Sequence, residues 1–234
     1  MSTEKNRSQT LIFCDFDGTV ARRDVGYSLF HRFSGGRNDE LLPDWKAGRM
    51  TSREILEREA AMCHAPEDEV YAFLDDFVIN SGFVEFEQTC REAGIPVVIL
   101  SDGLDIYVHR ILERYELSHI PVHCNRGQLI DNRITVEFPY PLGSCGRCGN
   151  CKGDRIAEYR ADRPDEELFV IFVGDGMSDT CAIGQADLLL AKKDLARYCV
   201  EHGIDFISYD TFFDVARVLH ELGILPSAPV QKKE

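Results

Sequence analysis

Aspartate residues recur at three places where an apolar run of the sequence ends in a polar, glycine-containing turn. The turns are Asp15-Phe16-Asp17-Gly18-Thr19, Ser101-Asp102-Gly103 and Gly174-Asp175-Gly176-Met177-Ser178-Asp179. Side chains alternate along an extended chain, so Asp15 and Asp17 point to the same side. Carboxylates that converge repel one another unless a cation lies among them, and a cluster of oxygen ligands favours Mg²⁺. We therefore expect Asp15, Asp17, Asp175 and Asp179 to form a magnesium site.

The same turns contain groups that could hold a phosphoryl group. They are the hydroxyls of Thr19 and Ser101, the backbone N–H groups of Asp102 and Gly103, and a lysine. This set permits phosphoryl transfer through an aspartyl-phosphate. Asp15 would attack phosphorus in line, while Asp17 would protonate the leaving alkoxide and then deprotonate the hydrolytic water. Because Asp17 must start protonated, we expect the incoming phosphate and Asp15 to raise its pKa.

The elements that carry these turns follow from the apolar pattern. Compact apolar runs at 10–14, 96–101, 168–173 and 187–191 indicate buried strands. Strands that alternate with helices predict a parallel sheet covered on both faces, with ligands beyond the carboxyl ends of the strands. The helical stretch between the first two strands is too long for a crossover. We therefore expect an α/β fold with a doubly wound parallel-sheet core, formed by residues 1–20 and 95–234, and an inserted helical cap at 21–94.

The turns resemble the motifs of the haloacid dehalogenase-like phosphatase superfamily. Residues 15–19 are similar to its first motif and Ser101 to its second. Lys152, in Cys151-Lys152-Gly153, is similar to the third motif, and residues 174–179 to the fourth. All four occur in the family's order and together span nearly the whole chain.

This resemblance implies a role for each matching residue. Asp15 would be the nucleophile and Asp17 the acid/base, with Ser101 and Lys152 completing the catalytic and phosphate-binding set. Mg²⁺ would bind Asp15, the main-chain carbonyl of Asp17 and Asp175, with Asp179 supporting that shell. The resemblance therefore predicts a phosphoric monoester hydrolase.

The helical insert resembles the smaller type of cap in this superfamily, and caps exclude water and select the substrate. Asp24 lies where phosphoserine phosphatases place an acidic residue that faces the substrate amine, but their carboxylate-binding arginine has no secure counterpart here. The same branch includes phosphatases for 2-hydroxy-3-keto-5-methylthiopentenyl-1-phosphate and for phosphocholine or phosphoethanolamine. We expect a magnesium-dependent phosphatase of one small metabolite, with the first of these compounds as the leading substrate and phosphoserine, phosphocholine and phosphoethanolamine as alternatives. Two alternatives belong to other functional classes than a phosphatase. One is a phosphotransferase or mutase, and the other is a zinc-stabilised binding protein without catalytic activity.

Three of the nine cysteines lie close together, directly before Lys152. An odd number of cysteines does not indicate a disulfide framework. The spacing of Cys145, Cys148 and Cys151 can wrap one metal ion, and Cys124 is the candidate for the fourth ligand of a structural Zn²⁺ site. The alternatives are reduced thiols without a metal and a redox-sensitive pair.

The charge balance bears on possible partners. The chain has 234 residues, with 26 Lys and Arg against 40 Asp and Glu, which gives a net charge of −14. Such a charge argues against nucleic acid or an anionic membrane surface as the main partner. No apolar run approaches the roughly 20 residues that cross a bilayer, and the first residues lack a signal-peptide core. We therefore expect a soluble, cytoplasmic enzyme whose partner is a small phosphorylated metabolite, with no signal for a particular oligomeric state.

Overall fold

A seven-stranded sheet forms the centre of the computed structural model, which describes residues 10–226. The strand order is β4-β3-β2-β1-β5-β6-β7, and every neighbouring pair is parallel except β3 and β4. The strands are β1 (Thr10–Asp15), β2 (Val97–Leu104), β3 (Val122–Ile130), β4 (Arg133–Glu137), β5 (Phe169–Gly174), β6 (Leu188–Ala191) and β7 (Ile207–Ser208). The predicted α/β class with a parallel sheet is confirmed.

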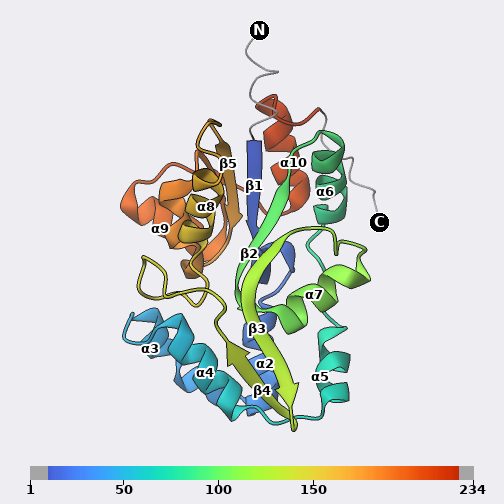
Figure 1. The fold of residues 1–234 in the computed structure, drawn as a ribbon, viewed down its shortest axis with the longest axis vertical. Coiled ribbons are helices and arrows are strands. Elements are labelled where there is room, and N and C mark those ends of the chain that lie inside the picture. The colour runs from blue at the N-terminus through green and yellow to red at the C-terminus, as the bar shows by residue number, and fades with distance from the viewer. Residues whose placement is uncertain (1–9, 227–234) are drawn as a thin grey trace.

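Helices cover both faces of this sheet and form a second lobe beyond its carboxyl edge (Figure 1). The α-helices are α2 (Val25–Ser34), α3 (Leu42–Lys46), α4 (Ser52–Met62), α5 (Glu67–Leu74), α6 (Phe83–Glu92), α7 (Asp105–Arg114), α8 (Lys152–Ala161), α9 (Lys193–His202) and α10 (Phe212–Glu221). Helical segments of other types are η1 (Phe16–Val20), which has π-helical hydrogen bonding, and the 3-10 segments η2 (Arg37–Glu40) and η3 (Met177–Gln185). In Figure 1, α2 to α5 and the β3–β4 hairpin make up the lower lobe.

Alternating residues of the strands enter two separate apolar layers. One layer contains Ile12 and Cys14 of β1 and is closed by α6, α7 and α10. The other contains Leu11 and Phe13 and is closed by α8 and α9. Because both faces of the central strands are buried, β1 and β5 read as continuous apolar runs in the sequence.

The insert between β1 and β2 is helical, as its sequence pattern predicts. Thr51 begins α4 with a capping box, in which its side chain and that of Glu54 bond each other's backbone N–H groups. The last helix of the insert, α6, packs on α10 through Phe83, Phe86 and Phe212. The helices that face the carboxyl edge of the sheet are therefore α2 to α5, while α6 covers the sheet itself.

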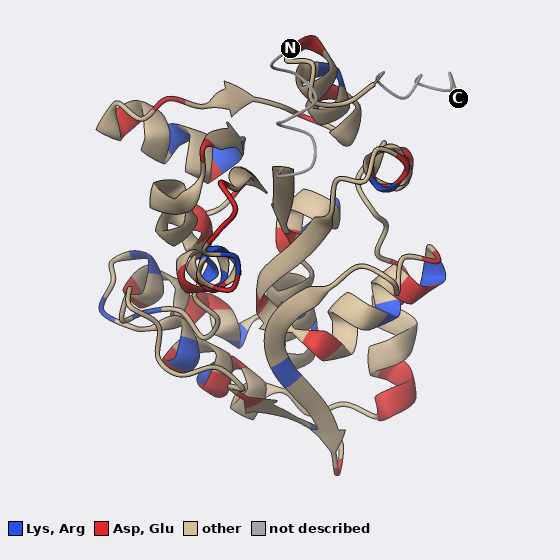
Figure 2. Cartoon of the chain, turned by 45° about the horizontal axis from the view of Figure 1, so that its top comes forward, with Lys and Arg blue, Asp and Glu red and all other residues tan. Residues whose placement is uncertain are grey.

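Charged residues lie mainly on helices and loops, and the central strands are largely free of them (Figure 2). Acidic side chains are spread over both lobes rather than gathered on one face (Figure 2). None of the helices among residues 10–226 combines the length and the apolar character needed to cross a membrane.

Replacing Phe86 by alanine should lower the free energy of unfolding by about 3–5 kcal/mol, because it leaves a cavity between α6 and α10. The Phe86 ring is fully buried and its centroid lies 5.2 Å from that of Phe212. Val84 lies on the same helix but is 36% exposed, so Val84→Ala is the matched control and should change stability by less than about 1 kcal/mol. Urea unfolding measures both, and similar losses in the two variants would contradict the packing described here.

Candidate active site

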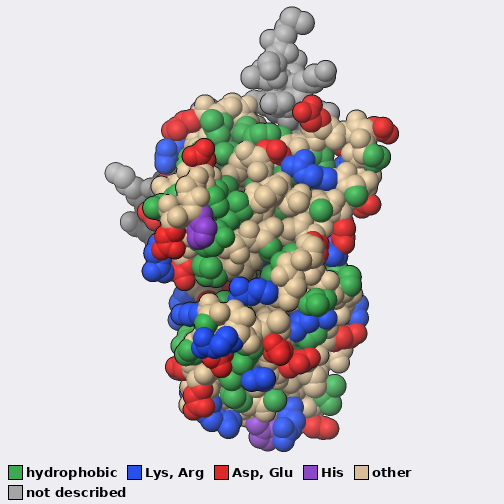
Figure 3. All heavy atoms as spheres, turned by 90° about the vertical axis from the view of Figure 1, so that its left-hand side faces the viewer, with side chains coloured by type: hydrophobic (Ala, Val, Ile, Leu, Met, Phe, Trp, Pro, Cys, Tyr) green, Lys and Arg blue, Asp and Glu red, His purple; other side chains and the backbone are tan. Residues whose placement is uncertain are grey.

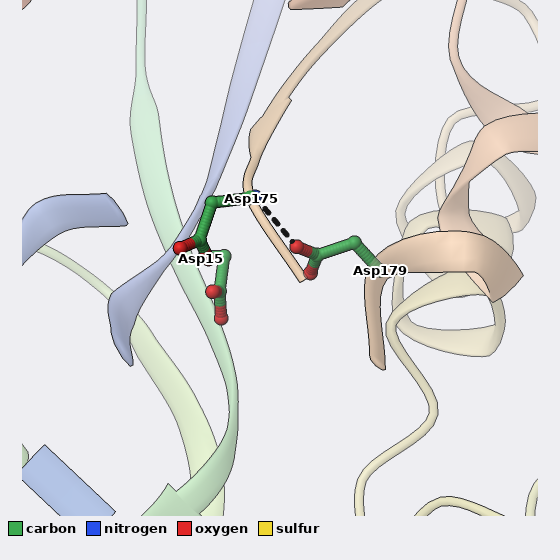
Figure 4. Close-up of side chains that lie close together, drawn as sticks. All are labelled: Asp15, Asp175 and Asp179. Atoms are coloured by element: carbon green, nitrogen blue, oxygen red, sulfur yellow. Dashed lines mark hydrogen bonds between the residues drawn. The ribbon is translucent and has the colours of Figure 1, made fainter. Parts of the chain in front are cut away.

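Three carboxylates from two strand ends lie next to one another at the carboxyl edge of the sheet. Asp15 is the last residue of β1, Asp175 directly follows β5, and Asp179 lies in η3. All three are buried, and one oxygen of each lies within 4.8 Å of the others. Figure 4 shows the side chains of Asp15 and Asp175 beside each other, with Asp179 alongside. The predicted convergence of the first and fourth motifs is thus present.

A buried lysine supplies the positive charge within this cluster. Lys152 is the first residue of α8 and is 1% exposed. Its Nζ donates to Asp15 Oδ1 at 2.5 Å and also to Asp179 Oδ1. Burial alone lowers the pKa of Lys152, but Asp15 and Asp179 outweigh that effect and hold it well above its usual value. Lys152 is therefore charged and oriented by the two carboxylates.

The Asp15 carboxyl is in an unfavourable environment for a charged group. Burial raises its pKa well above the ordinary range, and the neighbouring Asp179 raises it further. Lys152 acts in the opposite direction, and Asp175 and Asp17 add to the repulsion. A further cation beside Asp15 would favour its ionised form.

Asp179 holds the turn after β5 in place. Its Oδ2 accepts hydrogen bonds from the backbone N–H groups of Asp175 and Gly176, both at 2.9 Å. Since its other oxygen accepts from Lys152, Asp179 joins the fourth turn to the start of α8. Its geometry is that of a residue that supports the cluster.

Asp17 is held beside the cluster by α2 and α7. Its Oδ1 accepts from the N–H groups of Val25 and Gly26 at 2.8 and 3.1 Å, and its Oδ2 accepts from Tyr107 Oη at 3.0 Å. Burial raises the pKa of Asp17 and outweighs these hydrogen bonds, which lower it. The pKa of Asp17 is thus raised, as the sequence predicts, but the main cause is burial and not the neighbouring Asp15.

Glycine is required at two positions of this edge because the chain approaches other groups closely. Gly18 has φ +77°, and a Cβ there would overlap Asp175 Oδ2. A Cβ on Gly103 would overlap the hydroxyl of Tyr107, which bonds Asp17. Tyr107 was not identified from the sequence, where it reads only as an apolar position of a helix.

The second predicted turn, Ser101-Asp102-Gly103, lies inside β2, in the irregular stretch between Leu100 and Leu104, and two asparagines fix it. Ser101 Oγ is fully buried, donates to Asp17 Oδ2 at 3.4 Å and accepts from Gly103 N–H at 3.0 Å. Asp102 Oδ1 accepts from the N–H of Asn150 at 2.8 Å, and its carbonyl accepts from Asn125 Nδ2 at 2.7 Å. The Asp102 side chain therefore anchors the loop before α8, whereas Ser101 lies beside Asp17.

Thr19 and a second lysine flank Asp175 on the side away from Lys152. Thr19 Oγ1 donates to Asp175 Oδ1 at 3.3 Å, and Lys193 Nζ donates to Asp175 Oδ2 at 2.7 Å. Thr19 thus lies at the cluster, while its phosphate-binding role stays a prediction. Lys193 begins α9 and was not identified, because a lysine at a helix start carries no distinctive signal.

A cavity of about 830 Å³ lies between these strand ends and the cap. Asp15, Asp17 and Asp175 line it on one side, and residues of α2, α3 and α4 line the other. Figure 3 views the face where the two lobes meet and shows Lys and Arg side chains around the waist between them. Lys46, Lys193 and Arg197 are the basic residues that line the cavity.

Asp24 lies in this cavity at the start of α2, where its Oδ1 accepts from Tyr27 N–H at 2.8 Å. Its side chain reaches the solvent of the cavity, but the surrounding protein still raises its pKa to about 7, and Asp17 adds to the rise. The sequence prediction that Asp24 faces the substrate space is consistent with this placement.

The four cysteines predicted to share a zinc ion are not gathered into one set. Within residues 10–226 the three-aspartate cluster is the one group of at least three His, Cys, Asp or Glu side chains close enough to hold an ion. Cys124 lines a separate depression with Tyr140. The thiol of Cys148 instead lies within hydrogen-bonding reach of those of Cys151 and Cys181. The expected zinc site at Cys124, Cys145, Cys148 and Cys151 therefore has no support among the described residues.

The donor set of the aspartate cluster fits Mg²⁺. It offers only buried carboxylate oxygens, which Mg²⁺ prefers, and few protein ligands, which leaves room for water and substrate oxygens. Its three carboxylates contact two lysines, Lys152 and Lys193, so one negative charge remains without a counter-charge when all of them are ionised. A divalent cation would offset that excess.

Comparison with known proteins agrees with this fold. The haloacid dehalogenase-like hydrolase family matches residues 12–183. A 2-hydroxy-3-keto-5-methylthiopentenyl-1-phosphate phosphatase of Brevibacillus brevis is 28% identical over 223 residues, which cover 91% of this chain and 96% of the relative. A phosphatase of the same name from Bacillus pumilus is 30% identical to this chain over 209 residues, which cover 88% of this chain and 88% of the relative. The chain belongs to the haloacid dehalogenase-like hydrolase family.

A solved structure shares the architecture. The crystal structure of a HAD-family hydrolase of Salmonella enterica serovar Typhi has a TM-score of 0.70 at 20% identity, over 89% of this chain and 70% of that one. The doubly wound sheet, with its helical insert after the first strand, is therefore the fold of this hydrolase family.

Replacing Lys152 by methionine should lower the free energy of unfolding by about 3–5 kcal/mol at neutral pH, because it leaves two buried carboxylates without a counter-charge. The loss should be greater at pH 8 than at pH 5. A carboxyl group with a higher pKa in the folded state than in the unfolded state, where it is about 3.9, binds a proton more tightly when the protein is folded. Its contribution to stability is therefore complete below pH ~3.9 and is lost as the pH rises through the pKa of the folded state. The pKa of Asp15 is already raised, and removing Lys152 raises it further.

Urea unfolding in the presence of a chelator measures this effect. Lys46→Met is the matched control, since Lys46 is exposed and forms no ion pair among the described residues. A loss that is the same at pH 5 and pH 8 would contradict the electrostatic role of Lys152.

Proposed function

We propose that the protein is a magnesium-dependent phosphatase that hydrolyses a small organic phosphomonoester through an aspartyl-phosphate on Asp15. The observation that carries the proposal is the buried arrangement of Lys152 between Asp15 and Asp179, with Asp175 alongside. This arrangement leaves Asp15 at the wall of a cavity and places a fixed positive charge beside it. Phosphoryl transfer depends mainly on such positioning and on charge stabilisation.

The magnesium ion would be held by Asp15, the main-chain carbonyl of Asp17 and Asp175, with Asp179 supporting them. When bound, it would neutralise charge on the phosphoryl oxygens. Asp179 already uses both oxygens, on Lys152 and on the N–H groups of the fourth turn. Its support would therefore act through the position of Asp175 and Lys152.

In the first half-reaction, an Asp15 oxygen would attack phosphorus while Asp17 gives its proton to the leaving alkoxide. The raised pKa of Asp17 supports its protonated starting state. Tyr107, Val25 and Gly26 hold its carboxyl in one orientation through their hydrogen bonds. In the second half-reaction, Asp17 would take a proton from the water that attacks the aspartyl-phosphate.

The phosphoryl group would lie against the irregular part of β2 at Ser101–Gly103 and against Lys152. Ser101 Oγ and the Asp102 N–H would donate to it, Gly103 N–H would do so only on leaving Ser101 Oγ, and Thr19 would contribute a hydroxyl from beside Asp175. Because Ser101 Oγ already accepts from Gly103 N–H, its own proton is free to turn from Asp17 towards a phosphoryl oxygen. The leaving group would then extend towards the cap.

The leading candidate for the substrate is 2-hydroxy-3-keto-5-methylthiopentenyl-1-phosphate. It is the compound named in the curated relatives that cover nearly the whole chain. The cap side of the cavity supports an organic leaving group of this size, since Phe30, Trp45, Ile55 and Leu56 provide apolar surface there.

Purified protein should release inorganic phosphate from p-nitrophenyl phosphate when Mg²⁺ is added, and EDTA should abolish the activity reversibly. Asp15→Asn should lower kcat about a thousandfold or more, because an amide oxygen cannot form the covalent intermediate. Asp131→Asn, in the exposed turn between β3 and β4, is the matched control and should leave kcat unchanged. An Asp15→Asn variant of full activity would refute the mechanism, and phosphate found on an added alcohol instead of in solution would identify a phosphotransferase.

A further inference from the structure

The face of α4 that lines the cavity contains one carboxyl group among otherwise uncharged residues. Ser52, Ile55, Leu56 and Glu59 have the spacing of one helix face, and all four line the cavity and are buried. Glu59 is only 6% exposed. An apolar residue would satisfy the packing at this position, so the carboxyl needs another explanation.

The Glu59 carboxyl is held in place by a second buried residue. Asn38 is fully buried, and its Nδ2 donates to Glu59 Oε1 at 3.2 Å. Asn38 is itself fixed by Ser34, whose Oγ accepts from Asn38 N–H at 3.3 Å. Among the described residues Glu59 Oε2 has no hydrogen-bond partner. One oxygen is therefore fixed and the other is available to the cavity.

A comparison with the other buried glutamate shows what Glu59 lacks. Glu87 is buried to a similar degree and pairs with His119 at 2.7 Å and with Arg91 at 3.4 Å. Within residues 10–226 Glu59 forms no ion pair, although Lys46 and Arg197 line the same cavity. Burial raises the pKa of Glu59 to about 7, and Asp24 and Asp39 add to the rise. A buried carboxyl without a second partner is costly unless a ligand supplies one.

We propose that Glu59 is a specificity-determining residue whose free oxygen accepts a hydrogen bond from a donor on the leaving group of the substrate, either a hydroxyl or an ammonium group. The inference rests on the proposed phosphatase function, because it takes the phosphoryl group to lie at Asp15 on the opposite side of the cavity. A site with a buried, oriented hydrogen-bonding group discriminates against ligands that lack the matching group. The aromatic side chains of Tyr27, Phe30 and Trp45 surround the rest of the leaving group.

Three phosphomonoesters of equal chain length test this inference: propyl phosphate, 2-hydroxyethyl phosphate and 2-aminoethyl phosphate. They are compared by kcat/KM in the wild type and in Glu59→Gln and Glu59→Leu, with p-nitrophenyl phosphate as the general substrate. Glu57→Gln is the matched control, since Glu57 lies on the same helix and is exposed. Thermal unfolding verifies that each variant is folded.

The wild type should favour at least one donor-bearing ester over propyl phosphate by about tenfold or more. Glu59→Leu should remove that preference without lowering kcat/KM for propyl phosphate, and Glu57→Gln should leave it unchanged. If Glu59→Gln keeps the preference for the hydroxyl ester, the natural donor is a hydroxyl. If Glu59→Gln loses a preference for the amino ester, the natural donor is a cation.

Equal kcat/KM for the three esters in the wild type would overturn the inference, as would a preference that survives Glu59→Leu. Hydrolysis of p-nitrophenyl phosphate with none of the three esters accepted would also overturn it, while the proposed function would stand. Failure to hydrolyse any of the four esters with Mg²⁺ present would overturn the proposed function itself.

Discussion

The electrostatic repulsion among buried carboxylates at the carboxyl edge of the sheet is the constraint on which the site depends. Parallel strands that end at one edge bring Asp15 and Asp175 together, and η3 adds Asp179. Lys152 offsets part of this charge, since it contacts both Asp15 and Asp179. The remaining excess is the physical reason to expect a divalent cation there, and in the proposed function that cation would also offset the repulsion between the cluster and an anionic phosphoryl group.

The loops around this cluster are fixed by contacts between segments that lie far apart in the sequence. Asp102 accepts from Asn125 and Asn150, so the irregular part of β2 is tied to the loop that precedes Lys152. Arg53 of the cap donates to the carbonyl of Tyr140 at 2.6 Å, which joins α4 to the same region. The clustered carboxylates thus lie at the strand ends and in η3, whereas the opposite wall of the cavity belongs to the cap helices.

The sequence was sufficient to predict which residues converge where a polar residue directly follows the apolar run of a strand. Asp15 and Asp175 come at the ends of such strands, and parallel strands place their ends side by side. Ser101 follows the apolar part of β2, although that strand continues to Leu104. The sequence also placed Lys152 through its family motif. The α/β class followed from the alternation of strands and helices.

Residues that reach the site from helices were not predictable in the same way. Tyr107 and Lys193 contact Asp17 and Asp175 over 90 and 18 positions of sequence, and neither has a pattern that distinguishes it from an ordinary helix residue. Glu59 has the spacing of a packed helix face, so only its burial and its missing partner mark it. Among the cysteines, the sequence favoured Cys124 as the fourth ligand of the expected zinc site. In the structure, α8 packs against η3, and the thiol of Cys181 lies close to that of Cys148.

Titration of the metal-free protein with Mg²⁺ in a calorimeter tests most directly whether the strand-end carboxylates share one divalent ion. Asp175→Asn removes one charge from the cluster, and Asp102→Asn removes a buried carboxylate at the same edge that anchors a loop instead. Specific Mg²⁺ binding by the wild type and by Asp102→Asn, and binding weakened about tenfold or more in Asp175→Asn, is the predicted result. Equal Mg²⁺ affinity in the wild type and Asp175→Asn would contradict the shared site.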